Sequence, residues 1–513
     1  MPISIKTVWS IILSVTLSGA CAAQKPMAFN PDEKSLTDIQ TALNNGQLTS
    51  ESLVQAYLKR IAAIDQSGPT LNSIIAINPD AIRIAHQLDK ERAQGKLRGP
   101  LHGIPILLKD NIESLDPIPT TAGSLALKDN ISDRDAPIVA RLRSAGAIIL
   151  GKTNLSEWAN IRSSHSISGW SAVGGLTRNP YALSRNTCGS SSGSGVAIAA
   201  SLAVMAVGTE TDGSITCPSA INGLVGFKPT VGLLSQKYII PISHSQDTAG
   251  PMARSVYDAA VLLNAMSTLP ASPDYVRHLN NTSLKGLRLG VMRPLSGYHP
   301  GADAVFEQTL AALEKAGAVL VEVKTIDSIS DISKNEFTVL LSELKHNLNA
   351  YLADTPKTVK TRSLAELIAF NREHATAEMP YFGQDLFEAA QQSSDLQSAD
   401  YQRALANSGK VARTQLDSLL ARYEVAALVA PSGSPAWTTD LLNGDHYLGS
   451  ASTLPAVAGY PHLTVPMGTV QGMPVGISII TGQWQDSKAL QIGHAIEQET
   501  LARQPPRYLL NIP

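Results

Sequence analysis

Two serines in small-residue loops and one lysine after an apolar run could together carry out nucleophilic chemistry. Ser190 lies in the run Cys-Gly-Ser-Ser-Ser-Gly, and Ser214, 24 positions later, ends the run Thr-Glu-Thr-Asp-Gly-Ser. Lys109 follows the run Gly-Ile-Pro-Ile-Leu-Leu. A serine in such a turn can serve as a nucleophile, and a lysine removed from water can serve as a base. These residue types predict hydrolysis of an amide without metal, cofactor or catalytic histidine.

Lysine acts as a base only in its neutral form. Its ordinary pKa of about 10.4 must fall to near 7, and burial has to supply roughly 4 kcal/mol for this. The position of Lys109 directly after Ile106, Leu107 and Leu108 predicts that burial. A second serine between the lysine and the nucleophile would relay the proton, which gives a reason for two separate serine loops.

The turn before Ser214 could stabilise the negative charge that develops on the carbonyl oxygen. Its backbone N–H groups, from Thr211, Asp212 and Gly213, are consecutive donors that could point at that oxygen. Gly213 would let the substrate approach the backbone closely. We therefore expect the oxyanion hole in this turn.

Short apolar runs alternate with helical patterns, which predicts an α/β fold: one large domain with a mixed sheet covered by helices on both faces. Ser35 and then Thr49 or Ser50 are expected to start helices, and a polar, helical excursion is expected over about 325–410. The predicted strands are 104–108, 147–150, 203–207, 287–291, 319–323, 425–430, 463–465 and 476–480, and further helices are predicted over 79–94, 193–201, 304–316 and 487–502.

The N-terminus has the order of a secretory signal: Lys6, an apolar stretch over 8–17, then small residues. The predicted division is a signal peptide over 1–23 and one catalytic domain over 24–513. The apolar stretch is too short to span a bilayer, which needs about 20 residues. We expect export to the periplasm or the medium. Lipid anchoring at Cys21 is the weaker alternative, because the leucine of a lipobox would lie one place too far away.

The charge composition limits the kinds of partner that the chain is expected to bind. Charged residues make up 16% of the chain, the net charge is −2, and no run of like charge occurs, which argues against nucleic acid and anionic membranes. We expect a small-molecule or peptide amide as substrate, no obligate protein partner, and no metal or cofactor. Export would permit a bond between Cys188 and Cys217, but two free buried thiols are the expectation.

The ordered motifs resemble those of the amidase signature family, serine hydrolases with a Ser-Ser-Lys triad. The resemblance covers nearly all of the chain after the leader, and its motifs are 103–111, 151–154, the two serine loops, 226–232, 247–254, 458–461 and 473–476. It implies that Ser214 is the acylated nucleophile, Ser190 the bridging serine and Lys109 the base. The family's mixed sheet flanked by helices is implied as well.

Three positions depart from the family pattern. Cys188 stands where glycine is usual, Asp212 where a small residue is expected, and Thr216 where arginine is common. Without that cation a carboxylate-bearing substrate is disfavoured, because nothing would pair with it. The serine loops resemble the peptide amidase branch, which implies release of ammonia from C-terminal peptide carboxamides. Aryl amides and short aliphatic amides remain open.

Other functions are also compatible with parts of the sequence. The run Gly-Ser-Ser-Ser-Gly also fits the nucleophile elbow of an α/β-hydrolase-type esterase, with Ser191 as nucleophile and His244 or His462 as base. An amidotransferase subunit acting on aminoacyl-tRNA would share the triad, but the leader and the lack of a basic face argue against it. A non-catalytic binding protein on the same scaffold would not react with a fluorophosphonate at Ser214.

Overall fold

The computed structural model describes Met1 and residues 29–269, 273–281, 283–327 and 329–512. Apart from Met1, the predicted signal segment with Cys21 lies outside these residues. Within the described part of the chain, no helix has the length and apolarity that crossing a membrane requires.

One eleven-stranded mixed sheet runs through the molecule, in the order β1-β3-β2-β6-β8-β7-β12-β13-β11-β9-β10. Its strands are β1 Ile74–Ile77, β2 Pro105–Lys109, β3 Ile148–Thr153, β6 Met205–Glu210, β7 Val225–Lys228, β8 Thr248–Ala253, β9 Arg288–Met292, β10 Val319–Val323, β11 Ala427–Pro431, β12 His462–Val470 and β13 Met473–Ile480. A separate hairpin pairs β4 Trp170–Ser171 with β5 Gly175–Leu176. The predicted single-domain α/β fold with a mixed sheet is confirmed.

Two groups of parallel strands flank an antiparallel middle, and the edge strand β1 pairs antiparallel with β3. β2 lies parallel to both β3 and β6, and β9 lies parallel to β10 and β11. Between them β8, β7, β12 and β13 pair antiparallel. Parallel strands need crossover connections, usually helices, so they are buried on both faces. The five residues of β2 and the six of β6 are accordingly all buried.

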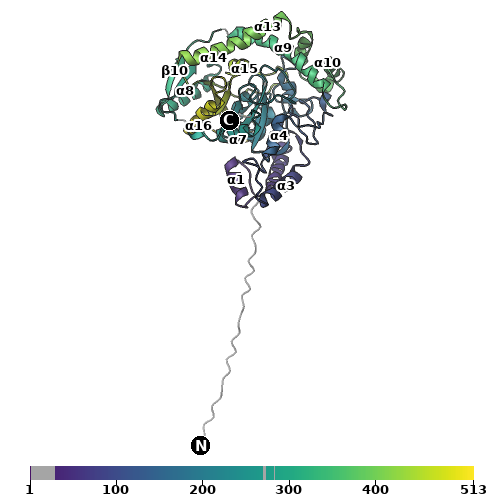
Figure 1. Cartoon of the computed structure of the whole chain (residues 1–513), viewed down its shortest axis with the longest axis vertical. Helices are drawn as coiled ribbons and strands as arrows, with labels where there is room; N and C mark the ends of the chain where they lie inside the picture. Colours follow the sequence, from purple (N-terminus) through teal and green to yellow (C-terminus); the bar gives the residue numbers. More distant parts are fainter. Residues whose placement is uncertain (2–28, 270–272, 282, 328, 513) are drawn as a thin grey trace.

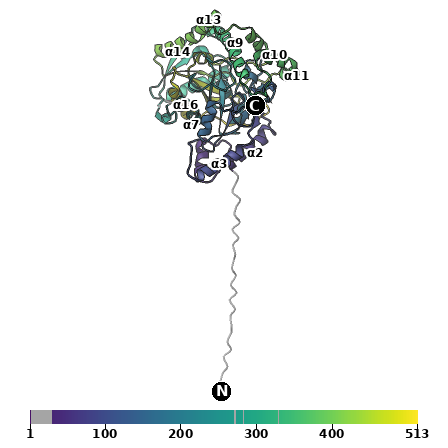
Figure 2. The same ribbon diagram turned by 45° about the vertical axis from the view of Figure 1, so that its right-hand side comes forward.

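Helices surround the sheet, and two groups of them gather at opposite ends of the molecule (Figures 1 and 2). Helices α1 and α3 lie at one end, and α9, α10, α13 and α14 lie at the other. The α-helices are α1 Leu36–Asn44, α2 Ser50–Arg60, α3 Ala81–Ala93, α4 Pro137–Ser144, α5 Ser192–Ala199, α6 Thr216–Ile221, α7 Val256–Met266, α8 Pro300–Lys315, α9 Ile329–Ala353, α10 Leu364–Glu373, α11 Ala375–Glu378, α12 Asp385–Gln392, α13 Ala399–Leu405, α14 Val411–Arg422, α15 Thr453–Ala458 and α16 Asp486–Thr500.

Most predicted elements are present, displaced by a few residues at their ends. Ser35 caps α1 and Thr49 caps α2, each with its side chain accepting from the backbone three residues on. The expected excursion over 325–410 is the helical group that starts with α9. Three strands of the large sheet were not predicted: β1, β7 and β8.

Candidate active site

Two parallel neighbours bring the predicted lysine beside the first residues of the second serine loop. β2 pairs with β6 in parallel, with Leu108 opposite Val207. The carboxyl ends of parallel strands meet at the same edge of a sheet. Lys109, the last residue of β2, therefore lies beside Thr209, near the end of β6.

Lys109 is fully buried and faces hydroxyl and carbonyl oxygens. Its Nζ donates to Ser190 Oγ at 2.7 Å and to Thr209 Oγ1 at 2.9 Å. Burial lowers the pKa of Lys109 to about 7, although the charges of Asp247 and Glu210 work in the opposite direction. Burial thus favours the neutral form of this amine, which touches the serine predicted to relay a proton.

The first serine loop is packed closely against the sheet. α5 begins at Ser192, and Gly193 lies so close to the backbone that an added Cβ would stand 2.4 Å from the Ser73 carbonyl oxygen. The peptide bond between Gly189 and Ser190 is cis. Ser190 is fully buried, and its hydroxyl is held by the lysine. The small residues of this loop are therefore required by packing.

Ser214 lies in the turn that follows β6, and its side chain is half-buried. Its carbonyl oxygen accepts from the Ser191 backbone N–H at 3.1 Å, which ties the two serine loops together. Among the described residues, the Ser214 hydroxyl has no hydrogen-bond partner. The structure thus joins Lys109 to Ser190 directly and places Ser214 in the adjoining turn, without a hydrogen bond between the two serine hydroxyls.

The turn is fixed at its flanks and open at its centre. Glu210 Oε2 accepts from the backbone N–H groups of Ile215 at 2.7 Å and Thr216 at 2.9 Å. Thr211 Oγ1 donates to Asp247 Oδ1 at 2.6 Å. Within the described ranges, the backbone N–H groups of Asp212 and Gly213 have no protein acceptor. These free donors lie where an oxyanion hole is predicted.

Asp212 and Thr216, two departures from the family pattern, have structural partners. Asp212 Oδ2 accepts from Thr453 Oγ1 at 2.8 Å, which links the turn to the start of α15, and burial raises the pKa of Asp212. The Thr216 hydroxyl donates to Glu210 Oε2 at 3.2 Å. Gly213 has φ of +79°, a conformation that favours glycine.

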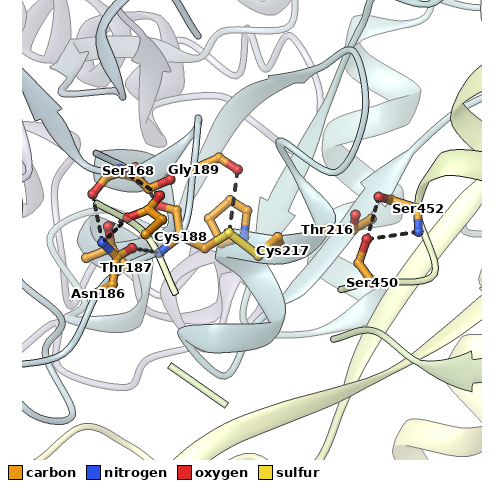
Figure 3. The surroundings of a disulfide bond; sticks show 12 residues. Ser168, Asn186, Thr187, Cys188, Gly189, Thr216, Cys217, Ser450 and Ser452 are labelled. Atoms are coloured by element: carbon orange, nitrogen blue, oxygen red, sulfur yellow. Dashed lines mark hydrogen bonds between the residues drawn. A yellow bond between two sulfur atoms is a disulfide. The ribbon is translucent and has the colours of Figure 1, made fainter. Parts of the chain in front are cut away.

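The expectation of two free thiols is wrong: Cys188 and Cys217 form a disulfide. Their Cα atoms lie 6.0 Å apart, a separation that a disulfide spans without backbone movement. Cys188 stands two residues before Ser190, and Cys217 stands three residues after Ser214, on the first turn of α6. Figure 3 shows the bond between the loop of Asn186 and Thr187 on one side and Thr216 on the other.

Two hollows meet at the turn. The larger, of about 510 Å³, is lined by Gly189, Asp212, Gly213 and Ser214 and by the disulfide. The other, of about 280 Å³, is lined by Asn111, Thr209, Glu210 and Thr211 and by apolar residues of 239–242. Because the larger one holds Ser214 and the free N–H groups, it is the place where a substrate carbonyl can meet them.

The side chains proposed for an α/β-hydrolase are engaged elsewhere. Ser191 Oγ donates to the Thr209 carbonyl oxygen at 3.1 Å and accepts from the Thr209 N–H at 3.2 Å. His462 is buried and bonded to Ser478 Oγ at 2.7 Å, and burial lowers its pKa to about 3. His244 pairs with Asn347 and Glu343. The Ser191 side chain thus links the first serine loop to strand β6 by hydrogen bonds.

Sequence reasoning missed Thr209, Glu210 and Asp247 as parts of the site. Thr209 and Glu210 stand at the start of the run that ends in Ser214, so their position was a usable signal. Asp247 lies in the motif of 247–254, and nothing in its neighbours indicates a contact with Thr211. In the described part of the chain, no three His, Cys, Asp or Glu side chains gather as a metal site would need.

Comparison with known proteins gives one family. A family model described as Amidase matches residues 52–490. Among curated relatives, a probable amidase of Arabidopsis thaliana is 38% identical over 97% of this chain and 96% of its own length. A glutamyl-tRNA(Gln) amidotransferase component of Symbiobacterium thermophilum is 34% identical over 89% of this chain and 94% of its own length.

Solved structures give the same result. The native peptide amidase of Stenotrophomonas maltophilia has a TM-score of 0.88 and 48% identity, covering 93% of this chain and 99% of that one. A complex of the peptide amidase PAM with the competitive inhibitor chymostatin has a TM-score of 0.89 and 48% identity, with the same coverage. An amidase family protein of Bacillus anthracis has a TM-score of 0.83 and 37% identity, covering 93% and 92%.

Proposed function

The chain belongs to the amidase family and is a hydrolase acting on amides, and we propose that it releases ammonia from the C-terminal carboxamide of peptides through a Ser-Ser-Lys triad. The observation that carries the triad is the contact of 2.7 Å between Lys109 Nζ and Ser190 Oγ at a fully buried lysine whose pKa is lowered to about 7. A neutral amine in that position can accept a proton from a hydroxyl.

In the proposed mechanism, Ser214 Oγ attacks the carboxamide carbon. Its proton passes to Ser190 Oγ while the Ser190 proton passes to Lys109 Nζ. The carbonyl oxygen becomes an oxyanion, for which the backbone N–H groups of Thr211, Asp212 and Gly213 are the proposed donors. Collapse of the tetrahedral intermediate returns a proton to the leaving nitrogen and releases ammonia. Water then hydrolyses the acyl-enzyme by the same route.

The charges around the larger hollow support a neutral carboxamide as substrate. Among the described residues that line it, the titratable ones include Asp212, Asp445, His165 and Tyr447, and neither lysine nor arginine is present. A free C-terminal carboxylate would find no cation to pair with there, whereas the carboxamide carries no charge. The structural similarity to peptide amidases at 48% identity supports the same substrate class.

An ammonia-release screen tests this proposal. The purified chain is incubated with one peptide in three forms, namely the C-terminal carboxamide, the free acid and the C-terminal anilide, and with a short aliphatic amide as a size control. We expect ammonia from the peptide carboxamide at the highest kcat/KM, and none from the free acid. Faster turnover of the anilide or the aliphatic amide would replace the peptide substrate by an aryl or aliphatic one while leaving the amidase chemistry in place.

We also propose that the enzyme acts outside the cytoplasm and without an obligate partner. The disulfide supports export, because such bonds persist in oxidising compartments. Fractionation of expressing bacterial cells should place the activity in the periplasm or medium, and the isolated chain should be fully active. Activity confined to the cytosol, or dependent on a second protein, would contradict these two points separately.

A further inference from the structure

The Cys188–Cys217 disulfide encloses both proposed catalytic serines in one covalent ring. The two cysteines are 29 positions apart, and the ring contains Ser190, α5, β6 and Ser214. It leaves out Lys109, which is held by its own strand. The bond therefore crosses between the two loops whose relative position decides whether a proton can pass from one hydroxyl to the other.

The Cys188 side of the bond is attached to a firm network. The Cys188 N–H donates to Asn186 Oδ1 at 2.7 Å. Asn186 Nδ2 in turn donates to the Ser168 carbonyl oxygen and to Asp445 Oδ1, both at 3.1 Å. Cys188 has φ of +53°, a region that glycine adopts far more easily than a residue with a side chain. A side chain is kept at this position despite that preference, and the sulfur bridge is what it provides.

The Cys217 side is attached to the nucleophile turn. The Cys217 N–H donates to the Gly213 carbonyl oxygen at 2.8 Å, the first helical bond at the start of α6. Cys217 lies in the first turn of α6, three residues after Ser214, which precedes the N-cap Ile215 of that helix. Figure 3 shows the bridge approaching Cys217 from the loop of Cys188 and Gly189.

From this arrangement we infer that the disulfide is a positioning device for Ser214, so that amide turnover depends on its oxidation state. The inference rests on the proposed function. The Ser214 hydroxyl has no hydrogen-bond partner among the described residues, so its position is set by the backbone of its turn. Because the bridge holds that backbone against the Ser190 loop, its loss should weaken catalysis more than substrate binding.

Reduction is chemically simple, and the bond is within reach of reagents. Both cysteines line the larger hollow, with 5% and 7% of their surfaces exposed. A dithiol such as dithiothreitol would transfer two electrons and two protons to the bridge. The products are thiols at Cys188 and Cys217 and the cyclic disulfide of the reagent. Reoxidation reverses the step.

The test compares oxidised, reduced and reoxidised enzyme in the ammonia-release assay, together with Cys188→Gly and Cys217→Ser. Glycine suits the backbone at 188, so Cys188→Gly removes the bridge without adding strain. In the reduced enzyme and in both variants we expect kcat to fall about tenfold or more and KM to change less than about twofold. Reoxidation of the reduced wild-type enzyme should restore its kcat. Dithiothreitol should have no further effect on either variant. The midpoint of the pH profile should stay in place, because the contact between Lys109 and Ser190 is untouched.

Leu313→Ala serves as a control for general destabilisation, because it empties a buried site on α8, which packs against β12, β11 and β10. If kcat falls equally in Leu313→Ala and in a bridge-free enzyme of the same melting temperature, the bridge only stabilises the fold. An unchanged kcat after complete reduction, verified by thiol titration, would overturn the inference. If the oxidised enzyme releases no ammonia from any amide, the proposed function fails instead, so the two failures are distinguishable.

Discussion

Two fully buried lysines lie on neighbouring strands, and only one of them is placed to act as a base. Lys109 ends β2 and Lys152 lies in β3, where it pairs with Leu108. Lys152 Nζ donates to the Ile112 carbonyl oxygen and to Thr120 Oγ1, both at 2.6 Å, and lies 4.0 Å from Asp110 Oδ1. Lys109 faces a serine hydroxyl.

Burial lowers the pKa of both lysines, so burial alone does not select the catalytic one. What differs is the partner. Lys152 is opposed by Asp110, and also by the charges of Asp116 and Glu113, which favour its charged form. Lys109 touches Ser190, whose loop is bonded to the turn of Ser214, whereas the hydroxyl at Lys152, on Thr120, donates to the Ile112 carbonyl oxygen at 3.4 Å. A buried lysine becomes a base where the hydroxyl that it touches adjoins a nucleophile.

The largest expected effect is the loss of activity when Lys109, but not Lys152, is replaced. In Lys109→Met we expect kcat to fall by at least about 10³-fold, because the base is lost. The fold should persist. Lys109 also donates to the carbonyl and hydroxyl oxygens of Thr209. In the variant these two oxygens still accept hydrogen bonds from Ser191 and Asn111, respectively. Urea unfolding monitored by circular dichroism, together with the amidase assay, gives both quantities. Turnover near the wild-type rate in Lys109→Met would remove this lysine from the mechanism.

The matched variant Lys152→Met should reverse the pattern. It leaves the buried carboxylate of Asp110 without its opposite charge, and the Oδ1 atom of that carboxylate already lacks a hydrogen bond. Losing one member of a buried ion pair costs about 3–5 kcal/mol. We expect that loss in the free energy of unfolding, with kcat per folded molecule within about a few-fold of wild type. A stable but inactive Lys152→Met would show that the two lysines share the chemistry.

The pH dependence follows from the sign of the Lys109 shift. Its pKa is lowered from 10.5 to about 7, and the neutral amine is the active form. We therefore expect kcat/KM to rise about tenfold per pH unit below 7 and to level off above it. The folded state disfavours the proton, so the stability penalty of this lysine is relieved as pH rises from about 7 to 10.5. A profile that is flat from pH 5 to 9 would contradict the lysine as base.

A smaller effect should come from Thr209→Val. The Thr209 hydroxyl accepts from Lys109 Nζ at 2.9 Å and so favours the charged amine. Without it the midpoint of the pH profile should move down by about 0.5–1 unit, and kcat should fall less than about tenfold. The profile of kcat/KM measured across pH 5 to 9 checks both values. A midpoint shifted upward would show that this hydroxyl holds the neutral amine instead.

The parts of the site that could be predicted from the sequence are those that lie close together along the chain. The apolar run before Lys109 predicted its burial, and the small residues after the first serine loop predicted a helix over 193–201, close to the observed α5. The strand β8 was missed because Gly250 and Pro251 are poor strand formers, although Pro251 pairs with Val207 in the middle of the sheet. The contact between Thr211 and Asp247 depends on that pairing.

The disulfide was missed for a different reason. Spacing along the chain does not determine whether two cysteines come within bonding distance, and their Cα separation of 6.0 Å results from the path of β6 and the turn after it. The partner of Asp212 likewise comes from a distant part of the chain, Thr453 at the start of α15. Both contacts depend on long-range packing, which local sequence patterns do not predict.

Trapping the nucleophile tests the central claim most directly, namely that Lys109 activates Ser214 through Ser190. The enzyme is treated with a fluorophosphonate, digested and mapped by mass spectrometry, with Ser214→Ala, Ser191→Ala and Lys109→Met alongside. We predict the adduct on Ser214 in the wild type and in Ser191→Ala, none in Ser214→Ala, and a much slower reaction in Lys109→Met. An adduct on Ser190 or Ser191, or labelling that persists in Ser214→Ala, would contradict the account.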